Sequence, residues 1–288
     1  MGTRVALITD SSACLPPDLW DSYSIRIVPQ GLVVGDSIIP DGSVTSWEMF
    51  ERVGSNRTLP RTASPTPGEF LCAMRDARAE RAPSVLCLTL SARYSGTYAA
   101  ALAAGEQMRK ETPGMEVRVV DTGGLAMAHG FAVLAAARAL DAGADMEAAA
   151  TSALKVGARA RLIGALESLD YAVKGGRVPR VVGWAASALQ IKPVLSFDGE
   201  RPRTISRPRT MRSATGRMLD YMGCLAGSGN NLHVAVMHSA ATDAAEGLAA
   251  QVKERFSPAE LLVTQFTSVM AVHTGPGFLG LAYYTDAD

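Results

Sequence analysis

Hydroxyl side chains gather first in the stretch RTASPTPGEF, residues 61–70. Thr62, Ser64 and Thr66 lie here beside two prolines, and a hydroxyl group both donates and accepts hydrogen bonds. Such a loop is suited to holding an uncharged or anionic oxygen. A helix cap followed by a rigid turn explains the same residues, because Gly-Glu-Phe after the second proline is a plausible helix start.

The stretch LSARYSGTY, residues 90–98, carries Ser95 and Thr97 on either side of Gly96. It follows an apolar, strand-like run and precedes a helical pattern, and helix N-termini attract anions through their free N–H groups. We therefore expect Ser95, Gly96 and Thr97 to bind a carboxylate or another oxyanion, with helix capping as the alternative. Ser95 as a hydrolase nucleophile is less favoured, because the G-x-S-x-G elbow is missing.

The stretch HTGPGFLG, residues 273–280, contains the G-x-G-x-x-G spacing in Gly275, Gly277 and Gly280. A dinucleotide fingerprint opens a helix inside a βαβ unit, whereas the residues after Gly280 are short, aromatic and strand-like. We expect these glycines to form a tight polar turn beside His273 instead.

Asp10, Ser11 and Ser12 follow the first strand-like run. An aspartate at this place can accept a phosphoryl group, but the acidic companion two residues on is replaced by serine. Capping by Ser11 or Ser12 is the simpler expectation. His129 falls inside an apolar helical pattern and is expected to be a packed, buried histidine.

The elements that position these residues alternate between strand and helix in the first half of the chain. RVALITD, SVLCLTL and MEVRVVD are apolar, β-branched runs, each followed by small polar residues and a helical pattern. Repeated strand–loop–helix units predict a parallel sheet covered by helices, in which ligands bind beyond the carboxyl ends of the strands.

The second half predicts an α+β domain with a mixed or antiparallel sheet. Asp198-Gly199 is a turn dipeptide between two extended runs, and helix, strand, helix and two strands follow. The fold class is therefore a two-domain α/β protein. We place the boundary near residue 160, which gives an N-terminal α/β domain over residues 1–160 and a C-terminal α+β domain over residues 161–288.

Composition excludes several classes of protein. Hydrophobic residues make up 48% of the chain, so it buries a large core, and the balance of 28 basic and 28 acidic residues disfavours a nucleic-acid partner. The four cysteines form no C-x-x-C pair, so buried thiols are expected rather than disulfides or zinc. No metal and no cofactor are expected. The absence of a long apolar run predicts a soluble, cytoplasmic protein without integral membrane association.

Taken in order, these motifs make the whole chain resemble the DegV family of bacterial fatty-acid-binding proteins. The motifs are ITDSSACLP, RTASPTPGEF, LSARYSGTY, VVDTGG, LDYAVKGGRV, KPVLSFDGE followed by RPR, and HTGPGFLG. The resemblance implies one long-chain fatty acid held between two domains, with its carboxylate on polar loops and its tail in an apolar tunnel. It also implies a partner, a separate ATP-dependent fatty-acid kinase that makes acyl-phosphate for phospholipid synthesis.

Thr62 and Ser95 match the family positions that bind the carboxylate, with Ser64, Gly96, Thr97 and Gly275 around them.

His273 and Arg209 match the positions associated with presenting the head group for phosphoryl transfer, and Arg177 of the GGRV motif is expected to support it. Two stretches depart from the family pattern: Ala63-Ser64 replaces serine and glutamine, and Arg207-Pro208 replaces lysine and its neighbour. We expect the first change to leave ligand binding intact, and the second to stiffen the loop that precedes Arg209 and to weaken kinase coupling.

Three hypotheses follow. The first is a non-catalytic carrier that presents a fatty acid to a kinase. The second is a hydrolase or transferase acting on an acyl group, with Ser95 as nucleophile and His273 as base. The third is a regulatory module whose lipid is a structural filler. Co-purifying lipid favours the carrier, and labelling of Ser95 by a fluorophosphonate probe favours the enzyme.

Overall fold

The computed structural model describes most of the chain. The described residues are 5–56, 59–175, 191–198, 201–226 and 231–286. They form two compact units, each made of two chain segments. The first unit comprises Met1–Gly31 and Ala63–Ala160, and the second comprises Leu32–Thr62 and Arg161–Asp288.

Residues 32–62 pack with the second unit, whereas the sequence analysis divided the chain only once, near residue 160. Buried hydrogen bonds explain the difference. Asp41 Oδ1 accepts a hydrogen bond from Ser268 Oγ at 2.9 Å and another from the backbone N–H of Val269 at 3.0 Å. A carboxylate buried this deeply needs such partners.

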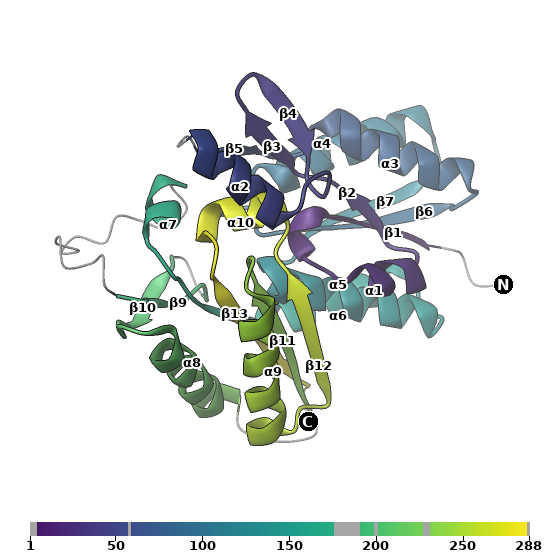
Figure 1. Ribbon diagram of the computed structural model, residues 1–288. Helices are drawn as coiled ribbons and strands as arrows, with labels where there is room; N and C mark the ends of the chain where they lie inside the picture. Colours follow the sequence, from purple (N-terminus) through teal and green to yellow (C-terminus); the bar gives the residue numbers. More distant parts are fainter. Residues whose placement is uncertain (1–4, 57–58, 176–190, 199–200, 227–230, 287–288) are drawn as a thin grey trace. The chain divides into compact units, whose positions relative to one another are not determined.

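The first unit is built on a parallel four-stranded sheet (Figure 1). Its strands, in the order β2-β1-β6-β7, are β2 (Arg26–Val28), β1 (Val5–Asp10), β6 (Ser84–Thr89) and β7 (Glu116–Asp121). All three neighbouring pairs are parallel. The predicted parallel sheet is confirmed, and its three longest strands are the three apolar runs identified in the sequence.

Helices cover both faces of this sheet. They are η1 (Ser11–Ala13), α1 (Pro17–Ser22), α3 (Pro67–Ala79), α4 (Thr97–Glu111), α5 (Ala126–Asp141) and α6 (Met146–Arg159). Helices α3 and α4 lie on one face, and α5 and α6 lie on the other (Figure 1). Helix α5 contacts α6, η1 and β1 and is buried at most of its positions, which explains its alanine-rich sequence.

The core of the first unit lies between the sheet and helices α3 and α4. Ile8 and Val85 from the strands meet Phe70 and Met74 from α3, and Ala101 from α4 completes this layer. These side chains are entirely buried. At about 25 cal/mol per Å² of apolar surface removed from water, such layers supply the main stabilisation of the unit.

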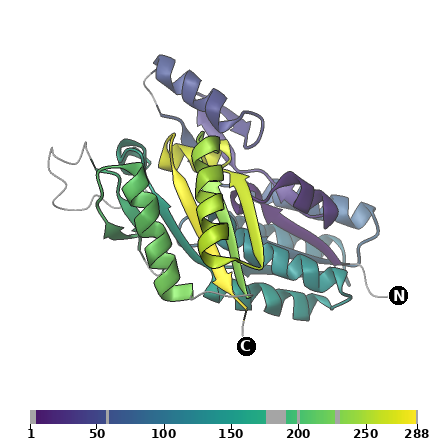
Figure 2. The ribbon, with the colours of Figure 1, turned by 60° about the horizontal axis from the view of Figure 1, so that its bottom comes forward.

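The second unit is built on a mixed six-stranded sheet (Figure 2). Its strands, in the order β10-β9-β8-β13-β11-β12, are β10 (Arg203–Ser206), β9 (Val194–Ser196), β8 (Arg161–Ala165), β13 (Leu279–Thr285), β11 (Leu232–His238) and β12 (Glu260–Gln265). Only the pair β11–β12 is parallel among these neighbours. The predicted mixed sheet is confirmed.

Strands β9 and β10 form an antiparallel pair, as the Asp198-Gly199 dipeptide predicts. Asp198 lies at its end, where its side chain accepts hydrogen bonds from Ser196 Oγ at 2.9 Å and from the backbone N–H of Leu162 at 2.9 Å. Gly199 lies outside the described residues. Asp198 thus ties the pair to the neighbouring strand β8.

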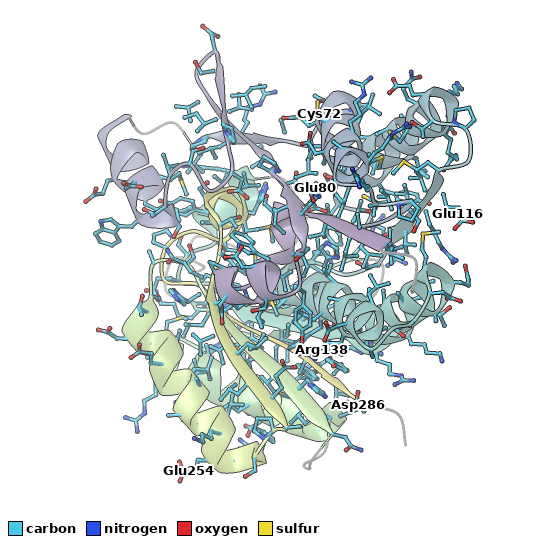
Figure 3. All side chains as sticks on the ribbon, turned by 90° about the vertical axis from the view of Figure 1, so that its right-hand side faces the viewer. Cys72, Glu80, Glu116, Arg138, Glu254 and Asp286 are labelled. Carbon is cyan, nitrogen blue, oxygen red and sulfur yellow. The ribbon has the colours of Figure 1, made fainter. Side chains whose placement is uncertain are left out.

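Helices α8 and α9 cover one face of the six-stranded sheet (Figure 2). The helices of this part of the chain are α7 (Asp170–Lys174), α8 (Met211–Ala226), α9 (Thr242–Phe256) and α10 (Ser268–Thr274). Met218 and Met222 of α8 and Leu248 of α9 pack onto Val234 and Leu281 of the central strands. Glu254, near the end of α9, lies on the exposed side of that helix (Figure 3).

Residues 31–63 form a small separate sheet and a helix, which the sequence analysis did not identify. The elements are β3 (Gly31–Val34), β4 (Ser37–Pro40), α2 (Ser46–Asn56) and β5 (Arg61–Ala63), and the sheet order is β4-β3-β5. Gly35, in the turn between β3 and β4, has φ +59°, a conformation that favours glycine. Helix α2 packs against α10.

All four cysteines are free thiols. Cys14 and Cys87 are buried, but Cys72 and Cys224 are exposed, so the expectation of buried thiols is wrong for half of them. Cys72 lies on α3 at the surface of the first unit (Figure 3).

Candidate functional site

Three hydroxyl groups of the first unit form a hydrogen-bonded chain. Ser64 Oγ lies 2.8 Å from Ser95 Oγ, and Ser95 Oγ lies 2.8 Å from Thr97 Oγ1. Thr97 is fully buried, whereas Ser64 and Ser95 are partly exposed. The hydroxyl chain therefore runs from the interior of the unit to a point that a ligand can reach.

The strand-to-helix turn after β6 holds Ser95 in this position. Helix α4 begins at Thr97, and its N-cap residue is Gly96, which makes no side-chain cap hydrogen bond. Ser95 Oγ instead accepts the backbone N–H of Thr97 at 3.3 Å. Ser95 therefore does bond to a backbone N–H at the helix start, as the capping alternative expects, but its hydroxyl also bonds to two other hydroxyl groups.

Thr66 has a structural role in the other hydroxyl stretch. It is the N-cap of α3 and forms a capping box with Glu69, since each side chain bonds to the backbone N–H of the other residue. This arrangement satisfies two N–H groups at the helix start. The capping interpretation holds for Thr66 and leaves Thr62 and Ser64 for other contacts.

Behind the hydroxyl chain lies Asp10, at the end of β1, with no exposed surface. Asp10 Oδ1 accepts hydrogen bonds from Gln30 Nε2 at 3.1 Å, from Ser12 Oγ and from the backbone N–H of Ser12. Asp10 Oδ2 accepts the backbone N–H of Leu90 at 3.0 Å. Asp10 is itself the N-cap of η1, so the expected capping by Ser11 or Ser12 is wrong.

The surroundings of Asp10 favour its charged form. Burial alone raises the pKa of a carboxyl group, but the hydrogen bonds and the favourable charge interaction with His129, together with Ser12 and Leu90, hold the pKa of Asp10 below its usual value. His129 Nε2 lies 3.6 Å from Asp10 Oδ2. The backbone N–H groups of Ser12 and Leu90 thus favour a carboxylate over a protonated acid at this buried position.

His129 is fully buried on α5, as the sequence predicts. Its Nε2 lies 2.9 Å from Thr9 Oγ1, and its Nδ1 lies 2.9 Å from Thr122 Oγ1. Because Thr122 donates its own hydroxyl hydrogen to the carbonyl of Thr89, its oxygen must accept from the imidazole. Nδ1 of His129 therefore carries a proton.

In the second unit, Thr62 and His273 form a pair. Thr62 Oγ1 lies 3.2 Å from His273 Nε2. Thr62 belongs to β5, and His273 belongs to the last turn of α10. His273 itself is a half-buried helical residue, and the turn expected beside it begins after the helix ends. The pair joins residues 211 positions apart in the chain.

The glycine turn after His273 connects α10 to β13. Gly275 and Gly277 have φ +78° and +79°, and a Cβ atom on Gly275 would lie 2.5 Å from the ring of Tyr171. Both the backbone conformation and the lack of space therefore require glycine at position 275. A strand follows this turn, so the dinucleotide interpretation lacks its helix, as the sequence analysis argued.

Arg209 is exposed in the bend that precedes α8. The carbonyl of its neighbour Pro208 accepts the backbone N–H of Lys192 at 2.7 Å, and the Lys192 ammonium forms an ion pair with Glu167. The loop is thus attached to the rest of its unit while the Arg209 side chain faces solvent. Arg177 lies outside the described residues.

The hydrogen bonds do not show the arrangement of a serine hydrolase among the described residues. The hydroxyl of Ser95 contacts the hydroxyls of Ser64 and Thr97, and Nε2 of His273 contacts Thr62. A nucleophilic serine needs a general base within hydrogen-bond reach. Within the first unit, the Ser95 hydroxyl bonds to two hydroxyl groups and to the backbone N–H of Thr97, not to a base.

One residue of the network, Gln30, was missed by sequence reasoning, and the role of a second, Asp10, was not recognised. Gln30 links Asp10 to the hydroxyl chain, because its Nε2 also lies 3.1 Å from Thr97 Oγ1. A lone glutamine between two short strands gives no signal in the sequence. Asp10 was noted, but its place at the strand end suggested phosphoryl chemistry or capping rather than a link to Thr97.

Two negative observations apply to the described part of the chain. No helix within it is long and apolar enough to cross a membrane. No group of three or more His, Cys, Asp or Glu side chains within it is arranged to hold a metal ion.

The fold and these polar groups define a class: two-unit α/β proteins with hydroxyl groups at the strand ends of a parallel sheet. The DegV family, described as "Uncharacterised protein, DegV family", matches residues 4–286. A DegV domain-containing protein of Streptomyces coelicolor, SCO2569, is 36% identical over 282 residues, which cover 98% of each chain. The chain therefore belongs to the DegV family.

Solved structures of the same fold carry a more specific description. A DegV family protein from Thermus thermophilus, described by its fatty-acid binding, is 29% identical with a TM-score of 0.89, covering 98% of this chain and all of that one. A protein from Eubacterium ventriosum, described as binding stearic acid, is 23% identical with a TM-score of 0.88 over 98% of each chain. At that identity, the second likeness shows the fold alone.

Proposed function

We propose that this protein binds one long-chain fatty acid and carries it without chemical change. The observation that carries the proposal is the Ser64–Ser95–Thr97 hydroxyl chain at the carboxyl ends of β1 and β6, where parallel sheets bind ligands. The Thermus relative, described by its fatty-acid binding, supports it.

The physical chemistry of a fatty acid matches such a site. A carboxylate removed from water needs hydrogen-bond donors, and several neutral hydroxyls supply them without a strong charge. Each methylene moved out of water contributes about 0.8 kcal/mol, so a tail of a dozen or more methylenes gives roughly 10 kcal/mol before ordering and desolvation offset part of it. The tail, in an apolar tunnel, provides affinity, and the hydroxyls fix the head group.

We assign the residue roles on the same basis. Thr62 and Ser95 donate to the carboxylate, and Ser64 and Thr97 support them through the hydroxyl chain. Gly96 opens α4 after Ser95, and its position leaves ordinary contact distance to Ser64, since a Cβ there would lie 3.6 Å from Ser64 Oγ.

Gly275 is the C-cap of α10, two residues after His273, and its backbone N–H donates to the carbonyl of Ala271. We assign His273, Arg209 and Arg177 to presentation of the head group for phosphoryl transfer. The exposed guanidinium of Arg209 supports this role, because a phosphoryl group is recognised by such cations.

The phosphoryl chemistry belongs to a separate ATP-dependent fatty-acid kinase in this proposal. The chain contains no G-x-x-x-x-G-K-[ST] phosphate loop. Within the first unit, the Ser95 hydroxyl bonds to the hydroxyls of Ser64 and Thr97. In this proposal the protein is a cytoplasmic substrate carrier rather than an enzyme.

Organic extraction of the purified protein, followed by mass analysis, tests the binding proposal. We expect one long-chain fatty acid per chain. Recovery of no lipid, together with failure of the delipidated protein to bind hexadecanoate, contradicts the proposal.

Incubation of the loaded protein with ATP and magnesium tests the carrier role. Acyl-phosphate is expected only when a fatty-acid kinase is added. Its formation by the protein alone, with loss in Ser95→Ala, identifies an enzyme instead.

A further inference from the structure

A buried amide connects the hydroxyl chain of the first unit to a fixed charge. Gln30 is 5% exposed, and its backbone N–H donates to Ser11 Oγ at 3.0 Å. Its side-chain Nε2 lies 3.1 Å from both Asp10 Oδ1 and Thr97 Oγ1. The amide is therefore held at both its backbone and its side chain.

The identity of the acceptor fixes the orientation of this amide. Both carboxyl oxygens of Asp10 already accept backbone N–H groups, Oδ1 from Ser12 and Oδ2 from Leu90, so Asp10 acts as an acceptor. The –NH₂ group of Gln30 must face Asp10, and its second hydrogen then points to Thr97 Oγ1. Exchanging the amide oxygen and nitrogen would place two acceptors against each other.

The orientation of the Gln30 amide also sets the donor and acceptor in each hydrogen bond between the hydroxyl groups. Thr97 Oγ1 accepts from Gln30, and because this hydroxyl is fully buried, its own hydrogen needs an acceptor. Ser95 Oγ, at 2.8 Å, is that acceptor. Ser95 Oγ also accepts the backbone N–H of Thr97, so it in turn donates outward, to Ser64 Oγ or to a ligand.

We propose that Gln30 is a positioning residue that directs the hydroxyl hydrogens of Thr97, Ser95 and Ser64 toward the ligand, so that the site selects an ionised carboxylate over a neutral head group. This inference rests on the proposed function. The outer hydroxyl groups present hydrogen-bond donors, and a carboxylate offers only acceptors. Hydrogen bonds to a charged acceptor are roughly twice as strong as those between neutral groups. An alcohol of the same chain length offers a weaker, neutral acceptor.

The test compares two ligands on each protein variant. Full-length, delipidated wild-type protein is titrated with hexadecanoate and with hexadecan-1-ol. We expect the acid to bind at least about tenfold more tightly, because one strengthened hydrogen bond accounts for that factor. In Gln30→Met, which keeps the side-chain length but removes the amide, the ratio of the two affinities should fall at least about fivefold.

Two further variants separate positioning from stability. Thr97→Val removes the next hydroxyl while leaving Gln30 and Asp10 in place, and it should reduce the ratio in the same way even where Gln30→Met does not fold. Gln107→Met, at an exposed glutamine of α4, is the matched control and should leave the ratio unchanged.

Each outcome decides the inference. A fall in the ratio in Gln30→Met supports it, and where Gln30→Met does not fold, a fall in Thr97→Val supports it. Equal weakening of both ligands shows a merely structural role and overturns it, as does an unchanged ratio in folded Gln30→Met, or in Thr97→Val where Gln30→Met does not fold. If wild-type protein binds neither ligand, the proposed function fails, and the inference fails with it. If wild type binds the acid but no variant changes the ratio, the inference alone fails.

Discussion

The two compact units organise their polar side chains differently. In the first unit, Asp10, Gln30, Thr97 and Ser95 are successive members of one network that begins at a fully buried charge. In the second unit, the contact of Thr62 with His273 is a single hydrogen bond at a partly buried position. In the first network, each donor and acceptor follows from its neighbour. In the Thr62–His273 pair, the imidazole tautomer decides which residue donates.

This difference predicts how each unit responds to the loss of one group. In the connected network, removal of one member leaves buried partners unsatisfied, and an unsatisfied buried donor costs about 1–3 kcal/mol. In the short pair, the remaining partner lies closer to solvent, so water replaces the lost contact. We therefore expect the loss of a group beside Ser95 to disturb its neighbours more than the loss of a group beside Thr62.

The largest effect is expected from Asp10→Ala. Four donors lose their acceptor, including Gln30 Nε2 and the backbone N–H of Leu90, and breaking a buried charged network typically costs about 3–5 kcal/mol. The free energy of unfolding, measured by chemical denaturation, should fall by that amount. Asp21→Ala, at an exposed position of α1, is the control and should change it by less than about 0.5 kcal/mol. Similar denaturation midpoints for the two variants would contradict the account of the network.

Ser95→Ala and Thr62→Ala compare the two hydroxyl positions directly. Each variant should remain folded and bind hexadecanoate more weakly. The loss for Ser95→Ala should be about 1.5–3 kcal/mol, because it removes a hydrogen bond to a charged group. Thr62→Ala should lose less, and Ser213→Ala, exposed on α8, should lose nothing. Equal affinity in wild type, Ser95→Ala and Thr62→Ala would remove both residues from the head-group site.

His273→Ala and Arg209→Ala test whether these residues serve phosphoryl transfer to the fatty acid rather than its binding. Lipid content should stay within about twofold of wild type, while turnover by a fatty-acid kinase should drop about tenfold, which corresponds to about 1.4 kcal/mol of activation free energy. Arg217→Ala, another exposed arginine near Arg209, should have no effect on turnover. Loss of lipid in both variants would instead move His273 and Arg209 into the binding set.

The smallest effect concerns pH. The hydrogen bond to Glu260, followed by that to Asp286, raises the pKa of His233 despite its partial burial. A raised pKa in the folded state gives stability that is fully present below the unfolded pKa of about 6.5 and is lost as pH rises through the folded value.

Wild type should therefore exceed His233→Gln in free energy of unfolding by more at pH 5.5 than at pH 8.5. The change between the two pH values should be less than about 1 kcal/mol. Paired denaturation at both pH values measures it. Asp10 has the opposite sign, since its lowered pKa gives stability that is lost as pH falls. A difference that grows with rising pH would refute the assignment for His233.

Much of the fold follows from local patterns in the sequence. The apolar runs around Leu7, Leu86 and Val119 predict the parallel strands, and the alanine-rich run around His129 predicts a buried helix. These signals are local because each strand or helix has its own period of apolar residues. Ser95 and Thr97 were identified for the same reason, since a strand end followed by a helix start is readable in one short stretch.

The remaining features depend on partners far apart in the chain. Residues 32–62 join the second unit through contacts such as Asp41 with Ser268, which are 227 positions apart. Gln30 reaches Thr97 across 67 positions. A polar side chain carries no sign in the sequence of which distant group it meets, so neither the discontinuous unit nor the role of Gln30 was predictable.

The discontinuity of the second unit has a consequence for synthesis of the chain. Residues 32–62 leave the ribosome before their partners on α10, because Asp41 precedes Ser268 by 227 positions. At ~5–20 residues per second, Asp41 is exposed for roughly 10–45 s before Ser268 follows it. All residues of the first unit have been synthesised once residue 160 is reached, before the partners of residues 32–62 exist. Synthesis of the first unit is therefore finished before synthesis of the second unit.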